Sequence, residues 1–146
     1  MKNTMMLLCA GIFLSLLLSG CSTVRVSIAA DTSLNRGING TPSPVAVRIV
    51  HFRSLPNFFS ASWSKLQQHF SGETHYLEPG QVAQWSVSVP NHSPYIGIAA
   101  DLRQREGRTW KCYQRLPDDH PRWFTEWDLF IDQNGLQVNG EGACQR

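Results

Sequence analysis

Hydrophobic and polar residues alternate with a period of two over several short stretches of the chain. Val24, Val26 and Ile28 are separated by polar residues, which is the pattern of a half-buried β-strand. The alternation is clearest over residues 82–89, which predicts one inward-facing and one solvent-facing side. Further short strands are predicted over residues 45–52, 74–77, 95–102 and 109–113. With a C-terminal hairpin, these stretches amount to seven or eight short strands.

The hairpin signal is carried by Asn134-Gly135, which stands between two alternating stretches. This residue pair is favoured in a two-residue type I′ turn. Such a turn pairs Ile131 with Val138 and Asp132 with Gln137, so apolar residues face each other and polar residues do the same. The pattern therefore predicts both the hairpin and its register.

One stretch follows the helical period instead. Trp63, Leu66 and Phe70 fall on one stripe of a helix, Ser60 is expected as its N-cap, and Gly72 is expected to end it. A mainly β chain of 146 residues, with seven or eight short strands and one short helix, is typical of a two-sheet β-sandwich.

The aromatic residues include candidates for the core and one candidate contact surface. Trp63, Trp85 and Trp127 lie on the predicted inner faces of their elements, so we expect them in the core. Trp123-Phe124 falls in a polar connection marked by prolines. Aromatic side chains exposed together are typical of contact surfaces, so this pair is a candidate contact patch.

The first residues predict export and lipidation. One positive charge, Lys2, precedes an apolar run over residues 5–18 that is too short to span a bilayer comfortably. The run ends in Leu18-Ser19-Gly20-Cys21, which resembles the bacterial lipobox, where the cysteine is diacylated and becomes the first residue after cleavage. We therefore expect residues 1–20 to be a cleaved lipoprotein signal peptide. The alternative is an ordinary signal peptide with an incidental cysteine.

Lipidation at Cys21 divides the chain into an anchor and one exported domain. Residues 21–30 form the lipidated N-terminus and first strand, and residues 23–146 form a single periplasmic β-sandwich. Ser22 follows the cysteine where aspartate would signal inner-membrane retention, so the sorting rule for such lipoproteins implies the outer membrane. Three acyl chains anchor a protein stably, whereas one chain binds only weakly and reversibly.

Two further cysteines remain in the exported domain. Cys112 and Cys144 are an even pair in an oxidising compartment, which favours one disulfide. Two free thiols are the alternative. Neither cysteine stands at metal-ligand spacing from any of the five histidines, so no metal site is predicted.

Charge and motifs argue against nucleic-acid binding and against catalysis. Charged residues make up 16% of the chain, the formal net charge is +2, and both signs are interspersed, whereas a nucleic-acid surface needs a clustered basic field. No nucleophile elbow, phosphate-binding loop or zinc helix is present. Asp118-Asp119-His120 is a local acid–base cluster beside two prolines, where such residues are usually solvated turn formers. We predict no catalytic residues.

Residues 34–49 have the sequence LNRGINGTPSPVAVRI. This segment resembles the signature of the TssJ family (also called SciN, VasD or Lip), the outer-membrane lipoproteins of bacterial type VI secretion systems, although Arg36 stands where the family usually has proline. Several other segments resemble that family in the same order. Residues 58–66 resemble its short helix and residues 95–100 its tyrosine-led strand. Glu78-Pro79-Gly80 resembles its turn, and Trp110-Lys111 its late strand. The resemblance runs from the lipobox to about residue 116.

The resemblance implies a structural role. The family fold is a transthyretin-like β-sandwich, and the family is not enzymatic. Apart from the covalent lipid on Cys21, the resemblance implies no cofactor. It further implies that the domain faces the periplasm from the outer membrane and binds the periplasmic domain of the inner-membrane protein TssM, with TssL in the same complex.

The resemblance also places the partner-binding element in the loop after the first strand, here residues 31–44. Its prolines reduce the freedom of the loop before binding, and its glycines permit close backbone approach. Leu34 and Ile38 are expected as apolar tips. The candidate contact residues are Leu34, Asn35, Ile38, Gly40, Pro42 and Pro44. The alternative is a loop that folds back over the sandwich.

Two other function classes stay open from the sequence. A lipoprotein pilot or small-ligand binder on the same sandwich requires a deep apolar pocket. A periplasmic hydrolase requires histidine and carboxylate groups that converge in a cleft, for which His120 is the starting point.

Overall fold

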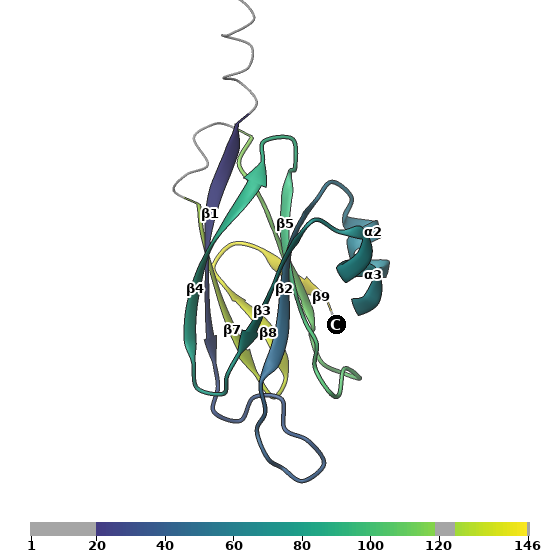
Figure 1. The fold of residues 1–146 in the computed structure, drawn as a ribbon, viewed down its shortest axis with the longest axis vertical. Helices are drawn as coiled ribbons and strands as arrows, with labels where there is room; N and C mark the ends of the chain where they lie inside the picture. Colours follow the sequence, from purple (N-terminus) through teal and green to yellow (C-terminus); the bar gives the residue numbers. More distant parts are fainter. Residues whose placement is uncertain (1–19, 119–124, 146) are drawn as a thin grey trace, which may run out of the picture.

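Two β-sheets pack face to face in the computed structural model, which describes residues 20–118 and 125–145 (Figure 1). One sheet has the strand order β4-β1-β7-β8 and the other the order β3-β2-β5-β6-β9. Neighbouring strands are antiparallel except β1 and β7, which run parallel. The elements are β1 (Cys21–Ala30), β2 (Val45–Phe52), α2 (Leu55–Ser60), α3 (Trp63–His69), β3 (Gly72–Leu77), β4 (Val82–Pro90), β5 (Tyr95–Ala100), β6 (Lys111–Arg115), β7 (Glu126–Asp132), β8 (Gly135–Asn139) and β9 (Ala143–Gln145).

The main core lies between the two sheets, as the alternation predicts. Val24, Val26 and Ile28 of β1 face inward and are buried, while the residues between them are exposed or half-buried. Trp127 is buried in the same core, but Trp85 is only half-buried and stacks on His75 at a ring distance of 4.5 Å. The predicted fold class, a mainly β two-sheet sandwich, is confirmed.

A second core lies under the two helices, on the outer face of the larger sheet (Figure 1). Phe58 of α2 stacks on Phe52 of β2 with ring centroids 4.4 Å apart. The prediction of one helix capped by Ser60 is wrong. Ser60 ends α2, and Ser62 caps α3 by accepting a hydrogen bond from the Lys65 backbone N–H. The chain is extended at Ala61 between the helices, which separates the apolar stripe into two short pieces.

Two cationic side chains from the sheet bind the C-terminal ends of these helices. Lys111 of β6 is buried, and its ammonium donates to the carbonyls of Phe58, Phe59 and Ala61 at 2.9, 2.7 and 2.5 Å. Arg48 does the same for α3, donating to the carbonyls of Leu66 and Phe70 at 2.9 Å each, and to the Thr74 hydroxyl. Because a helix end leaves its last carbonyls without partners and carries partial negative charge, each cation fixes one helix to the sheet.

Replacing Lys111 with methionine is expected to lower the free energy of unfolding by about 2–4 kcal/mol, because buried carbonyls lose their donor. Burial, aided by the nearby charge of Arg105, lowers the pKa of Lys111 to about 8, so the ammonium form still predominates at pH 7. Urea denaturation at pH 7 measures the effect. Lys65→Met is the matched control, since Lys65 is exposed on α3. Equal stability of the two variants would contradict the role given to Lys111.

The β7–β8 hairpin is present, but its predicted register and turn type are wrong. Ile131 pairs with Leu136, and Asp132 with Gly135. A type I′ turn needs a positive φ at Asn134, yet within the described part of the chain Asn35 is the sole non-glycine residue with one. The Asp132 carboxylate accepts the Asn134 backbone N–H at 2.7 Å and so bends the chain one position earlier.

Gly135 allows close packing of the backbone, whereas its sequence context suggests the second residue of a type I′ turn. A Cβ at this position would meet the Thr109 carbonyl oxygen at 2.0 Å. The glycine thus allows the hairpin to approach the segment before β6, where the Leu136 N–H donates to the Thr109 carbonyl at 2.7 Å. Because the register moves by two residues, Ile131 and Leu129 keep their inward orientation.

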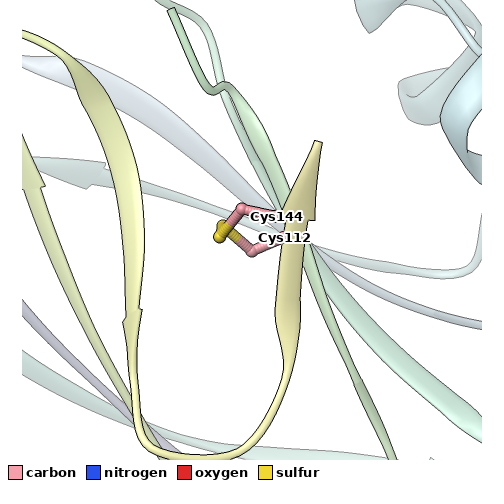
Figure 2. The surroundings of a disulfide bond; sticks show 2 residues. All are labelled: Cys112 and Cys144. Carbon is pink, nitrogen blue, oxygen red and sulfur yellow. A yellow bond between two sulfur atoms is a disulfide. The ribbon is translucent and has the colours of Figure 1, made fainter. Parts of the chain in front are cut away.

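A disulfide joins Cys112 of β6 to Cys144 of β9, as predicted (Figure 2). The two cysteines face each other in the antiparallel pairing of these strands. The bond closes a loop with a sequence separation of 32 residues. Loop-closure entropy for such a span corresponds to roughly 3–4 kcal/mol of stabilisation. The short strand β9, which the sequence pattern does not predict, is held at the sheet edge by this bond.

Candidate partner-binding end of the sandwich

The start of β1 and the loop of residues 31–44 lie at opposite ends of the sandwich (Figure 1). Cys21 is the first residue of β1, pairs with Pro90 of β4, and has an exposed free thiol. The ten residues of β1 run the length of the domain, and a strand of this length spans about 33 Å. The loop follows directly at its far end. Residues 1–19, which make up all but the last residue of the predicted signal peptide 1–20, lie outside the described part of the chain.

The base of the loop is built into the sandwich. The backbone N–H of Ala30 donates to the Gln81 carbonyl at 2.8 Å, and that of Asp31 to the Ile131 carbonyl at 2.9 Å. The Asp31 carboxylate also accepts hydrogen bonds from the Ser33 hydroxyl and backbone N–H, and these bonds lower the pKa of Asp31. The four-stranded sheet and the turn that leads into β4 therefore fix the point from which the loop departs.

Leu34 is not an apolar tip, which corrects the prediction from the sequence. Its side chain is fully buried in the core between the sheets. The loop turns back at this point, because the Leu34 N–H donates to the Asp31 carbonyl and the Leu34 carbonyl accepts from the Ser43 N–H at 3.2 Å. Leu34 thus anchors the loop to the domain and presents no surface to a partner.

Asn35 likewise has a structural position. It is buried and adopts a positive φ of 50°, a conformation that asparagine tolerates better than most residues. Its side-chain amide donates to the Pro44 carbonyl at 2.9 Å, and its amide oxygen accepts the Arg103 backbone N–H at 2.9 Å. One side chain therefore joins the two ends of the loop and ties them to the β5–β6 connection.

The tip of the loop, residues 36–42, is the exposed part. A tight turn forms where the Gly40 N–H donates to the Gly37 carbonyl at 2.9 Å, and Gly40 has a positive φ of 71°. Ile38 is 97% exposed, and Pro42 and Pro44 are also exposed. Of the six predicted contact residues, Ile38, Gly40, Pro42 and Pro44 are thus accessible, whereas Leu34 and Asn35 support them from below.

An open groove of about 460 Å³ separates the tip from the β5–β6 connection. It is lined by Arg36, Gly37, Ile38, Asn39, Thr41, Arg103 and Gln104. The Arg103 guanidinium lies so close to Gly37 that a Cβ there would meet it at 2.7 Å. Within the described residues, no salt bridge engages Arg36 or Arg103, so the groove is positively charged. This lining differs from the deep apolar pocket that a small-ligand binder requires.

Three further residues at this end are not among the contact residues predicted from the sequence. Arg103 lines the groove, and Tyr76 and Val82 flank the β3–β4 turn on the outer faces of the two sheets, with exposures of 73% and 77%. That turn contacts the base of the loop through the Gly80 N–H, which donates to the Asp31 carbonyl. The alternation over 82–89 already places Val82 on the solvent-facing side. No local signal places Arg103 beside the loop.

The remaining candidates for acid–base or metal chemistry are a histidine, any group of metal ligands and the predicted acid–base cluster. His51 at the end of β2 pairs through Nδ1 with the Ser93 hydroxyl at 3.1 Å, and burial, with a contribution from His92, lowers the pKa of His51. No group of three potential metal ligands occurs among residues 20–118 and 125–145. Asp119 and His120 of the acid–base cluster, and the candidate patch Trp123-Phe124, lie outside the described residues.

No described helix has the length and apolar character needed to cross a bilayer.

Comparison with known proteins then places the sandwich in a family. No curated protein matches the chain by sequence. The family model for type VI secretion lipoproteins (VasD, EvfM, TssJ) matches residues 22–140.

Solved structures share the fold. Lip from Serratia marcescens, described as a membrane-bound component of the type VI secretion system, superposes with a TM-score of 0.73 at 21% identity, covering 83% of this chain and 98% of Lip. The lipoprotein TssJ1 from Pseudomonas aeruginosa gives 0.70 at 15% identity, covering 86% and 98%. A chain in a structure described as the TssM C-terminal domain from EAEC gives 0.69 at 21% identity, covering 81% and 98%.

The family model spans the core strands of both sheets, the two helices and the loop of residues 31–44. The similar folds of the lipoproteins Lip and TssJ1 agree with that match. The chain belongs to the type VI secretion lipoprotein family.

Proposed function

We propose that the protein is a lipid-anchored subunit of the type VI secretion membrane complex. Acyl chains on Cys21 hold it in the outer membrane, and the tip of the loop binds the periplasmic domain of TssM, with TssL in the same complex. Membership of the lipoprotein family supports this role, as does the similarity to a chain in a structure described as the TssM C-terminal domain.

The observation that carries the proposal is the position of the tip. It projects from the end of the sandwich opposite Cys21, so an anchor in the outer membrane directs it into the periplasm (Figure 1). Ile38 is almost fully exposed there, which is uncommon for an isoleucine unless a partner covers it.

The rigidity of the loop base favours binding. Asn35 and Ser43 close the loop through hydrogen bonds to the Pro44 and Asn35 carbonyls, so little conformational freedom is left to lose on association. Covering an isoleucine side chain contributes about 1.5–3 kcal/mol. Arg36 and Arg103 beside it offer guanidinium groups to carboxylates or carbonyls of the partner.

Ile38→Asp tests the proposal. We expect it to weaken binding to the TssM periplasmic domain by about 10- to 100-fold, because the apolar contact is lost and a charge must be desolvated. Thermal stability should stay unchanged, since the side chain contacts solvent. Isothermal titration calorimetry measures the affinity. Ser88→Asp, exposed on β4 away from the tip, is the matched control and should bind normally. Wild-type affinity of Ile38→Asp would exclude the tip as the contact.

A further inference from the structure

The domain begins without a spacer after the lipidation site. Cys21 already pairs with Pro90 as the first residue of β1, and Ser22 is buried. The Ser22 hydroxyl donates to Asn91 Oδ1 at 2.9 Å, which ties the second residue of the strand to the β4–β5 loop. A lipid attached to Cys21 would therefore be attached to the folded sandwich itself and not to a flexible leader.

The β4–β5 loop, residues 91–94, lies beyond Cys21 on the side away from the loop of residues 31–44. Because β4 runs antiparallel to β1 and pairs with Cys21 at Pro90, the chain that leaves β4 continues past the level of Cys21. Gly20, which precedes Cys21, lies beside the Asn91 side chain. Figure 1 shows this loop at the same end of the molecule as the start of β1.

The loop is also ordered and chemically suited to a polar surface. The Ser93 backbone N–H donates to the Pro90 carbonyl at 2.9 Å, and the Ser93 hydroxyl contacts His51. His92 is exposed and Asn91 half-buried, so an imidazole and an amide face outward, and residues 90–94 contain no acidic side chain. Such groups donate hydrogen bonds to phosphate oxygens without repelling an anionic leaflet.

We propose that this end of the sandwich is a membrane-contacting surface, with residues 91–94 in the phospholipid headgroup layer. The inference rests on the proposed lipidation of Cys21, whose glycerol linkage lies at that depth. The domain then stands upright on the leaflet, with β1 directed along the membrane normal. The tip of the loop is held roughly 30 Å from the headgroups at a fixed height and orientation.

Fluorescence quenching of the lipidated full chain tests this proposal. A thiol-reactive dye is placed on His92→Cys or on Ile38→Cys, since the lipid blocks Cys21 and the disulfide occupies Cys112 and Cys144. The proteins are reconstituted in phosphatidylethanolamine–phosphatidylglycerol vesicles that carry a headgroup quencher. We expect quenching at position 92 to exceed that at position 38 several-fold.

A linker variant is the matched control. Six glycine and serine residues inserted between Cys21 and Ser22 should remove most of the difference between the two positions, because the domain is then free to tumble. Thermal unfolding confirms that all variants are folded. Equal quenching at both positions, with the lipid on Cys21 verified by mass spectrometry, overturns the membrane contact but leaves the proposed anchoring intact. Absence of the lipid mass overturns both.

Discussion

Replacing Cys21 with serine is expected, under the proposed lipidation, to remove almost all of the protein from the outer-membrane fraction. Lipidation alkylates a thiolate, which a serine hydroxyl does not supply. Without the acyl chains, the proposed membrane anchor is lost. Membrane fractionation with immunoblotting measures the shift, and intact-mass analysis reports the lipid.

The released protein should remain folded, because the Cys21 side chain is exposed and free. Its thermal unfolding midpoint is therefore expected to match that of the wild-type domain. Thr23→Ser, an exposed change two residues along β1, is the matched control and should stay in the membrane fraction. A Cys21→Ser protein that still fractionates with the outer membrane would refute the anchor.

The strands were the most predictable part of the fold. Residues such as Val24, Val26 and Ile28 report their burial directly, since a strand in a sandwich exposes every second side chain. The disulfide was equally predictable, because Cys112 and Cys144 are the single pair that remains in the predicted exported domain once Cys21 is set aside as the expected lipidation site. Their position in facing strands, however, depends on a strand, β9, that is too short to leave a pattern.

Local signals were less reliable where two of them compete. At the β7–β8 hairpin, Asn134-Gly135 favours one turn, but the Asp132 carboxylate captures the Asn134 N–H and favours another. Both registers place the same side chains inward, so hydrophobic alternation does not distinguish them. Ser60 and Ser62 pose the same problem at the helices, since either serine is a suitable N-cap.

Side-chain contacts between distant segments leave no pattern in the local sequence, so they could not be predicted. Lys111 and Arg48 bind helix ends that lie about 50 and 20 positions away in the sequence. Asn35 joins Pro44 and the Arg103 backbone in the same way. The sequence therefore gives the composition of the loop of residues 31–44. It does not tell which apolar residue of the loop is buried in the core and which is exposed at the tip.

Leu34 and Ile38 resolve that question in a paired experiment. Leu34→Ala is expected to lower the free energy of unfolding by about 2–5 kcal/mol, the usual range for a fully buried leucine, because the sheets lose the contacts and a cavity remains. Ile38→Ala should change it by less than about 0.5 kcal/mol, since its side chain lies in solvent. Guanidinium denaturation of the purified Cys21→Ser protein measures both values.

The two positions should behave in opposite ways toward the partner. If the tip binds TssM as proposed, Ile38→Ala is expected to weaken that binding while the domain keeps its stability, because the proposed apolar contact is lost. Leu34→Ala should affect binding only as far as the loop base loosens, so its binding should recover at temperatures well below its unfolding midpoint. A Leu34→Ala variant that kept full stability but lost binding would contradict this assignment. Leu34 would then have to contact the partner directly, and the rigid loop base would be refuted.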